Sequence, residues 1–222
     1  HINDDVLLIS DYDSDGDNDL ILTIRPVSAS TRNISVLQNN LSTGAGFIIV
    51  DLISDISSSS TAPVVTCIDY DNDSDDDLLI NIKPTTGGIG GSGFFTLSPV
   101  LLYQNNNGTY IDVTASAGLS AVITNHFGFA NILDINRDGF MDFLVGTTDE
   151  ASTISTFSGN IKNRYLQNNG NGTFTDITNT IDLYSDYGYY HNSTVADLNN
   201  DRKDEVIWEY STGGGLTQMK VF

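Results

Sequence analysis

Residues 69–77 read DYDNDSDDD and lie between two short apolar runs, Val64–Ile68 and Leu78–Ile80. So many carboxylates in one loop repel one another unless a cation lies among them. Three further windows place oxygen-bearing side chains at the same positions 1, 3, 5 and 9. They read DYDSDGDND at 11–19, DINRDGFMD at 134–142 and DLNNDRKDE at 197–205. In chain order the four windows hold five, six, three and four acidic residues, which is 18 of the 29 in the chain.

The spacing predicts a cation site in each window. Ca²⁺ fits better than Mg²⁺, because it accepts about six to eight oxygens in flexible geometry, with position 7 supplying a backbone carbonyl. The predicted ligands are Asp11, Asp13, Asp15, Asp17 and Asp19; Asp69, Asp71, Asp73, Asp75 and Asp77; Asp134, Asn136, Asp138, Phe140 and Asp142; and Asp197, Asn199, Asp201, Lys203 and Glu205. We therefore expect up to four structural Ca²⁺ ions. The fourth is expected to bind most weakly, because Arg202 and Lys203 bring positive charge there. The alternative is a set of solvated Asp and Asn turns without metal.

These windows are not EF-hand loops, which need a Glu at position 12 and a helix on each side. Position 12 is apolar in every window, being Leu22, Ile80, Val145 and Trp208. Short β-type runs precede and follow each window, so the pattern predicts hairpins whose turns hold a cation. Position 6 is glycine in two windows, which permits a sharp turn, and is Ser74 or Arg202 in the other two.

A second element recurs in step with the acidic windows, whose first residues are 58, 65 and 63 positions apart. It has Gln-Asn-Asn at 38–40, 104–106 and 167–169, followed by a turn and another β-type run. Each unit is thus predicted to hold four antiparallel strands, which is typical of a β-propeller blade. A plain β-sandwich is the alternative, although it does not explain the repetition. The expected blades are residues 1–60, 61–120, 121–185 and an incomplete 186–222.

Two stretches resemble a known repeat family. Phe127–Gly146, which spans the third window, is similar to the FG-GAP blade of integrin α-subunit propellers, and Asn169–Asp176 resembles the VCBS-type variant. The resemblance extends over nearly the whole chain and departs from the pattern at Ser74, Arg202 and Glu205. It implies a calcium-stabilised propeller outside the cytoplasm. Because about 3.75 blades are present and propellers of this family usually have about seven, we expect the chain to be part of a longer propeller.

The composition excludes several classes of partner. Nine Lys and Arg against 29 Asp and Glu give a formal net charge of −20, which opposes binding to nucleic acid or to an anionic membrane. No run approaches the roughly 20 apolar residues of a membrane span. The one cysteine, Cys67, is expected to be a buried, inert thiol. Few histidines and no known catalytic motif leave little material for catalysis, so no enzymatic activity is expected.

Two further sets of candidate residues lie outside the windows. Tyrosines cluster with His191 in a stretch that suits a sugar or another ligand, although packing between blades explains them as well; these residues are Tyr187, Tyr189, Tyr190 and His191. Glycosylation sequons outside the windows begin at Asn33, Asn40, Asn107, Asn171 and Asn192, of which Asn33 and Asn192 are the preferred acceptors.

The expected function is that of a secreted or cell-surface calcium-binding propeller that serves adhesion, recognition or structural display. Its partner would be a protein or glycan at the cell surface or in the matrix, further blades of the same chain, or other copies. The alternatives are a carbohydrate-binding lectin, a non-catalytic portion of a larger secreted enzyme, and a subunit of a surface filament.

Overall fold

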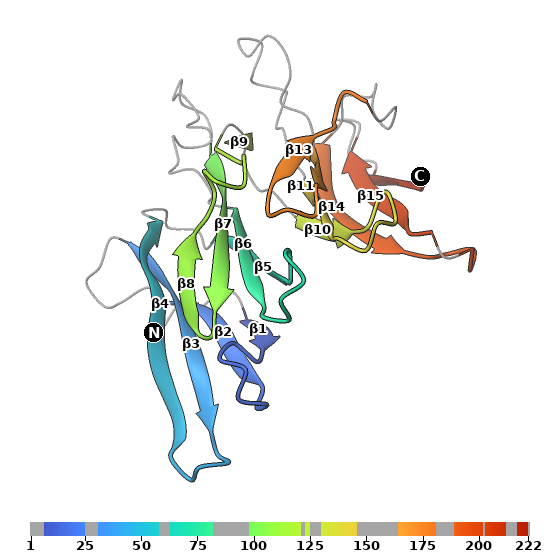
Figure 1. The fold of residues 1–222 in the computed structure, drawn as a ribbon. Helices are drawn as coiled ribbons and strands as arrows, with labels where there is room; N and C mark the ends of the chain where they lie inside the picture. Colours follow the sequence, from blue (N-terminus) through green and yellow to red (C-terminus); the bar gives the residue numbers. More distant parts are fainter. Residues whose placement is uncertain are drawn as a thin grey trace, which may run out of the picture.

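The computed structural model describes residues 7–24, 31–57, 63–81, 98–120, 123–124, 130–145, 164–180, 189–201, 203–211 and 217–221. Within these ranges every regular element is a β-strand, and the strands form four antiparallel sheets in which chain neighbours pair (Figure 1). The all-β fold expected from the sequence is confirmed. None of the described residues form a helix long and apolar enough to cross a membrane.

We number the sheets I to IV in chain order. Sheet I contains β1 (Leu7–Ser10), β2 (Asp19–Ile24), β3 (Arg32–Asn40) and β4 (Gly46–Ser57). Sheet II contains β5 (Val64–Ile68), β6 (Asp77–Asn81), β7 (Ser98–Asn106) and β8 (Thr109–Asp112), with the short β9 (Ile123–Thr124) paired to the start of β7. Sheet III contains β10 (Ala130–Leu133), β11 (Asp142–Val145), β12 (Arg164–Asn168) and β13 (Phe174–Asp176). Sheet IV contains β14 (Tyr189–Ala196), β15 (Glu205–Ser211) and β16 (Thr217–Val221).

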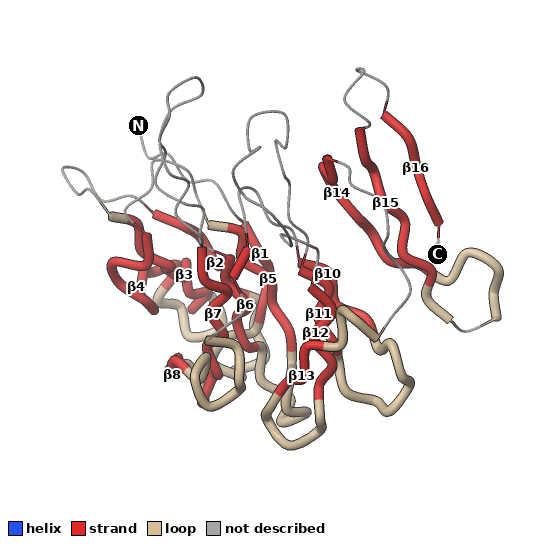
Figure 2. The backbone as a smooth tube through the Cα atoms, turned by 90° about the horizontal axis from the view of Figure 1, so that it is seen from above, coloured by secondary structure: helices blue, strands red, loops and turns tan. Residues whose placement is uncertain are grey.

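The sheets follow one another in an open series, as blades do, and the described residues do not close a ring (Figure 2). Their first strands are neighbours in the order β1, β5, β10, β14. Each acidic window joins the first and second strands of its sheet, so the predicted hairpins are confirmed. The turn between the third and fourth strands lies at the same end of an antiparallel meander. The acidic windows and the Asn-rich turns therefore gather on one side of the molecule.

Each interior sheet is buried on both faces. The core between sheets I and II includes Ile21, Leu78 and Ile80, whereas Leu79 faces sheet III. All five residues of β6 are buried, which explains why this strand reads as a continuous apolar run rather than an alternating one. Between sheets III and IV the core is smaller and is built on Leu133, Leu144, Tyr165 and Val206.

Buried asparagines at the end of the third strands connect neighbouring sheets. The Asn105 side chain donates from Nδ2 to the backbone carbonyl of Tyr12 in the preceding window at 2.8 Å, and its Oδ1 accepts from Gly108 N–H at 2.8 Å. Asn168 repeats the first contact, donating to the carbonyl of Tyr70 at 2.7 Å. The first asparagine of the recurring Gln-Asn-Asn motif thus supplies a hydrogen bond between sheets.

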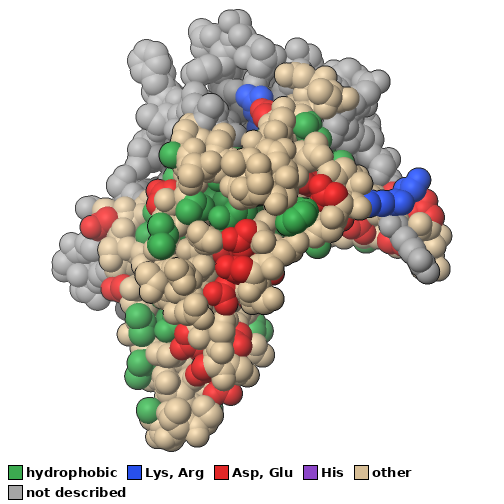
Figure 3. Space-filling model, viewed as in Figure 1, with side chains coloured by type: hydrophobic (Ala, Val, Ile, Leu, Met, Phe, Trp, Pro, Cys, Tyr) green, Lys and Arg blue, Asp and Glu red, His purple; other side chains and the backbone are tan. Residues whose placement is uncertain are grey.

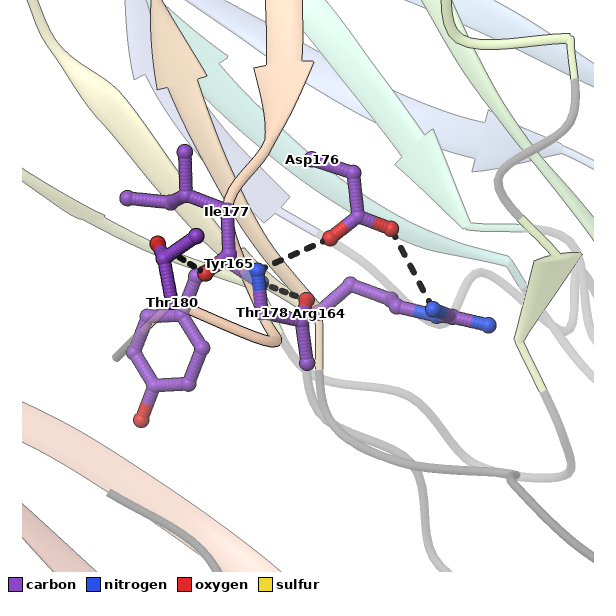
Figure 4. Close-up of polar contacts among 6 residues, drawn as sticks. All are labelled: Arg164, Tyr165, Asp176, Ile177, Thr178 and Thr180. Atoms are coloured by element: carbon purple, nitrogen blue, oxygen red, sulfur yellow. Dashed lines mark hydrogen bonds and ion pairs between the residues drawn. The ribbon is translucent and has the colours of Figure 1, made fainter. Parts of the chain in front are cut away.

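A short corner ends the outer strand of sheet III (Figure 4). Asp176 Oδ1 accepts from Thr178 N–H at 3.0 Å, and Thr178 Oγ1 accepts from Tyr165 N–H at 3.0 Å. Ile177 N–H donates to the carbonyl of Tyr165 at 2.9 Å, and Arg164 forms an ion pair with Asp176 at 3.2 Å. These bonds terminate the strand pairing.

The same corner closes sheet II at Asp112, Val113 and Thr114, with Thr114 N–H bonded to Asp112 Oδ1 at 2.9 Å. Sheet I has Asp51 but no threonine two residues later, where Ile53 stands instead. Its β4 continues to Ser57, with irregular register on the way. An Asp-x-Thr signal in the sequence therefore marks the end of a blade.

The predicted inert thiol is half-buried in the core between sheets I and II. Burial, with a smaller contribution from Asp76 and Asp77, raises the pKa of Cys67 to about 12. The thiolate that nucleophilic chemistry needs is therefore absent at neutral pH.

Replacing Asn105 by alanine is expected to lower the free energy of unfolding by about 1–3 kcal/mol, because the buried carbonyl of Tyr12 loses its donor. Urea denaturation measures this change. The matched control is Asn106→Ala at the exposed neighbouring position, where a change within about 0.5 kcal/mol is expected. Equal losses in the two variants would show that the bond between the sheets is not the cause.

Candidate metal centre

The acidic windows share one backbone conformation. Position 4 lies in the left-handed region in all four, at φ values of 56° for Ser14, 60° for Asn72, 62° for Arg137 and 62° for Asn200. Position 6 is left-handed as well wherever it is described, and Ser74 adopts a φ of 75° at the place where two other windows have glycine. The departure from glycine at Ser74 thus leaves the turn unchanged, at a cost in backbone strain.

The position 1 carboxylate organises each turn. Asp69 Oδ1 accepts from Asp73 N–H at 3.0 Å and Oδ2 accepts from Ser74 N–H at 3.1 Å. Asp11 and Asp134 hold the corresponding two N–H groups of their windows, and Asp197 holds that of Asp201. Each window is therefore prefolded by its own first residue.

The position 9 carboxylate fastens the window to the third strand. Asp77 is fully buried; its Oδ2 accepts from Tyr70 N–H at 3.0 Å and its Oδ1 accepts from Asn105 N–H at 2.7 Å. Asp19 and Asp142 make the same pair of bonds in sheets I and III. Glu205 accepts from Leu198 N–H and from the Asn199 amide, and within the described part of the chain these bonds to its own window are the ones it makes. This structural role was not predicted from the sequence, which suggested only a ligand.

Two windows bring three carboxylates together. Oxygens of Asp11, Asp13 and Asp15 lie within 4.8 Å of one another, as do oxygens of Asp69, Asp71 and Asp77. Among the described residues, no such group of three is found in the third and fourth windows, where position 3 is Asn136 or Asn199 rather than aspartate. The Asn136 amide donates to Asp138 Oδ2 at 2.8 Å, so an N–H occupies the place of a ligand oxygen.

The position 3 carboxylates carry the clearest sign of a cation. Asp71 Oδ2 accepts from Gln104 Nε2 at 2.6 Å, whereas its Oδ1 is buried without a hydrogen-bond partner. Asp13 has the same arrangement, with Gln38 at 2.6 Å and a buried, unpartnered Oδ1. A buried anionic oxygen without a donor is costly unless a positive charge is near. The residues present therefore fit a hard, oxygen-binding cation.

Electrostatics support this fit. Burial is the largest cause that raises the pKa of Asp77, to about 7, and repulsion from Asp71 and Asp73 acts in the same direction against two backbone hydrogen bonds. Burial and then the charge of Asp73 raise the pKa of Asp71, while hydrogen bonds from the Gln104 side chain and the Asp73 backbone N–H act in the opposite direction. Burial likewise raises the pKa values of Asp19 and Asp142. A bound cation would oppose these rises by stabilising the ionised forms.

The position 7 residues, predicted as carbonyl ligands, have their N–H groups held by position 5. Asp15, Asp73, Asp138 and Asp201 accept from the N–H groups of Asp17, Asp75, Phe140 and Lys203, respectively. The side chain of Asp75 joins the windows instead: it accepts from Ser14 Oγ at 2.7 Å and from Asn107 N–H at 3.1 Å. The Ser14 bond is the main cause that lowers the pKa of Asp75. The windows are thus interlocked across sheets.

The predicted glycosylation sites differ in accessibility. Asn107 and Asn171 are exposed in turns, and Asn40 is half-buried. Asn33, preferred from the sequence, is only 8% exposed, and its amide bonds to Asp51 at 3.2 Å and to Asp55 N–H at 3.1 Å. Burial therefore argues against Asn33 as an acceptor.

The predicted tyrosine cluster cannot be assembled from the described side chains. The backbones of Tyr189, Tyr190, His191 and Asn192 form the start of β14, but their side chains lie outside the described part. Tyr187 lies outside the described residues altogether.

Comparison with known proteins gives one family match. Residues 134–208, from the start of the third window to β15, match the model of the FG-GAP-like repeat, which confirms the resemblance for that part of the chain. No curated protein matches the chain.

Among solved structures, the chain is similar to one described as "Structural basis of specific recognition of non-reducing terminal N-acetylglucosamine by an Agrocybe aegerita lection". The identity is 15% and the TM-score is 0.32, over 97% of this chain and 65% of that one. The chain therefore spans less than two thirds of that protein's length.

Replacing Asp77 by asparagine is expected to lower the free energy of unfolding by about 1–3 kcal/mol even in EDTA, because an amide presents only one oxygen to two backbone N–H groups. Denaturant unfolding at mildly alkaline pH measures the loss. Asp71→Asn is the matched control: in EDTA its stability should be unchanged or higher, because one buried repelling charge is removed. If both variants lose equal stability without metal, Asp77 and Asp71 do not have the different roles proposed here, hydrogen bonding to the backbone and cation binding.

Proposed function

We propose that this chain is a non-enzymatic extracellular recognition module whose sheets are propeller blades and whose acidic windows bind structural Ca²⁺. The observation that carries the proposal is the buried, unpartnered Oδ1 of Asp71 beside the carboxylates of Asp69 and Asp77. The matching arrangement at Asp13 makes it a repeated feature. Ca²⁺ suits such a site because it accepts carboxylate, carbonyl and water oxygens in flexible geometry.

In this proposal a bound ion makes the acidic windows of neighbouring sheets more rigid. The windows already contact one another through Ser14 and Asp75 and through Asn72 Nδ2, which donates to the carbonyl of Gly139 at 3.3 Å. A cation held in one window therefore acts on the next sheet as well. At millimolar Ca²⁺ and a Kd of about 10⁻⁴–10⁻³ M, each site stabilises the fold by roughly 0.4–1.4 kcal/mol.

The recognition role follows from where these parts lie. The windows and the Asn-rich turns form a polar rim at one end of the sheets, and such loops on a rigid scaffold are common binding surfaces. The carboxylates at positions 1 and 9 are occupied with backbone N–H groups, which leaves them poorly placed for acid–base catalysis. We propose a protein or glycan at the cell surface or in the matrix as partner, and a larger propeller of about seven blades as the context.

Removing calcium is expected to lower the melting temperature, and titration calorimetry should detect two stronger sites, in the first and second windows. Asp71→Asn should abolish one of them and Asp13→Asn the other, since each variant removes the unpartnered oxygen's charge. An unchanged melting temperature in EDTA, together with no binding heat, would contradict the calcium proposal. The recognition role is tested separately by calcium-dependent retention on immobilised glycans and matrix proteins, which Asp71→Asn should weaken.

Asn136→Asp is expected to strengthen calcium binding in the third window by about tenfold or more, because affinity in such loops rises with the number of charged ligands. The gain is measured by calorimetry or by terbium luminescence. Asn169→Asp adds the same charge to an exposed turn of the same sheet and should leave the affinity unchanged. A similar gain in both variants would point to general charge rather than to a ligand at position 3.

A further inference from the structure

Five steps in the chain place a glycine directly after an aspartate or an asparagine. They are Asp15-Gly16, Asn107-Gly108, Asp138-Gly139, Asn169-Gly170 and Asn171-Gly172. At such a step the backbone nitrogen of the glycine can attack the side-chain carbonyl carbon of the residue before it, because glycine has no side chain to hinder the approach. All five steps lie in described turns, so the hydrogen bond of each glycine N–H can be compared.

In four of the five steps the glycine N–H donates to a side-chain oxygen of another residue. The donor and acceptor pairs are Gly16 with Asp11 at 3.0 Å, Gly139 with Asp134 at 2.9 Å, Gly108 with Asn105 at 2.8 Å and Gly170 with Asn168 at 3.0 Å. A nitrogen whose proton is held by such an acceptor must break this bond before it can react. These four steps are therefore protected by the fold.

Gly172 is the exception. Its N–H has no acceptor among the residues that the structure describes, and Asn171 before it is exposed. The space beside Gly172 is open, with no atom within 4 Å of the point where a side chain would begin. At Gly170 the corresponding space is filled by the Phe140 ring, which lies 2.7 Å from that point. The Asn171-Gly172 step thus has a free nitrogen and room for a new ring.

The Asn171 side chain is held in a position that favours the attack. Its Oδ1 accepts two hydrogen bonds, from Thr173 N–H at 3.2 Å and from Thr173 Oγ1 at 2.6 Å. The first bond folds the side chain back over the peptide that joins Asn171 to Gly172. Both donors lie at the oxygen on which negative charge develops when Cγ is attacked. The Thr173 hydroxyl itself accepts from Asn169 Nδ2 at 2.9 Å, so a chain of hydrogen bonds polarises the amide.

We propose that Asn171 is a site of spontaneous deamidation and isomerisation in the folded protein. Solvent takes the proton of Gly172 N–H, and the nitrogen forms a bond to Cγ of Asn171. The bond from Cγ to the amide nitrogen breaks, and this nitrogen takes up a proton from solvent and leaves as ammonia. Water then opens the cyclic succinimide at either of its carbonyls, which gives aspartate or isoaspartate. The net reaction exchanges ammonia for water and needs no oxidant, reductant or metal ion.

The reaction changes the turn between β12 and β13. It adds a carboxylate to a protein whose formal net charge is already −20, and Figure 3 shows acidic side chains gathered on the face in view, with Lys and Arg at few places. Isoaspartate also lengthens the main chain of the turn by one atom. The nitrogen that leaves is the one that a glycan would occupy in the Asn171 sequon, so the conversion removes this candidate acceptor.

The proposal is tested by peptide mapping with mass spectrometry, on the full chain produced without glycans and incubated at mildly alkaline pH. Asn171 should convert about tenfold faster than Asn107 and Asn169, which are controls within the same molecule. Labelling by an isoaspartyl methyltransferase detects isoaspartate in the same peptides. In the urea-denatured chain the three asparagines should convert at similar rates, because the held N–H groups and the positioned side chain are both lost.

The contribution of the Thr173 hydroxyl is tested with Thr173→Val, which keeps the backbone donor and removes the Oγ1 donor. This variant should slow the conversion of Asn171 in the folded protein by about two- to tenfold, the factor that one neutral hydrogen bond supplies. Its rate in the denatured chain should not change. The matched control is Thr175→Val, which removes a hydroxyl that donates to Asn169 Oδ1 at 3.1 Å and should leave the conversion of Asn171 unchanged.

Three results would overturn the proposal. Equal rates at Asn171, Asn107 and Asn169 in the folded protein would show that the free Gly172 N–H does not decide reactivity. A faster reaction of Asn171 that persists in urea would assign the effect to local sequence rather than to the fold. An unchanged rate in Thr173→Val would show that the hydroxyl does not assist the attack. None of these readouts depends on a bound ion, so they are independent of the calcium proposal.

Discussion

The buried carboxylate at the last position of each acidic window is the contact on which the rest depends. Asp77 accepts one N–H from the start of its window and one from Asn105 in the third strand. The side chain of Asn105 then donates to the preceding sheet at Tyr12. One charge thus connects the turn, the sheet and its neighbour. The same connection recurs at Asp142. Hydrogen bonds to an ionised carboxylate are stronger than those between neutral groups.

This arrangement separates two kinds of carboxylate in one window. Those at positions 1 and 9 have backbone donors and would keep the turn folded without a metal. Those at position 3 have one oxygen on a glutamine and one oxygen buried without a donor. The proposed ion therefore completes a site that is already built, rather than folding a disordered loop. In the third window, where position 3 is Asn136, the side-chain amide donates a hydrogen bond to Asp138 of the same window.

The two interior sheets, II and III, each pack against a neighbouring sheet on both faces. Sheets II and III each have one apolar face for the sheet before and another for the sheet after. Ile9 in sheet I and Leu198 in sheet IV are exposed, whereas their counterparts in sheet II, Cys67 and Tyr70, are half-buried and buried, respectively. The Asp-x-Thr corner at Thr114 and Thr178 ends the outer strands of sheets II and III, whereas β4 of sheet I, which lacks this threonine, continues to Ser57.

The sequence by itself determined the strands, the repeat and the positions of the acidic windows, because alternation of apolar runs with clustered Asp, Asn and Gly is a local signal. It also located Asp13 and Asp71 as ligand candidates from spacing alone. Only the tertiary structure decided which carboxylates gather, since the partners Gln38, Asn105 and Tyr12 are distant in sequence. It likewise buried Asn33. Burial and the pairing of distant hydrogen-bonding groups are set by how the sheets pack, and no local pattern contains that information.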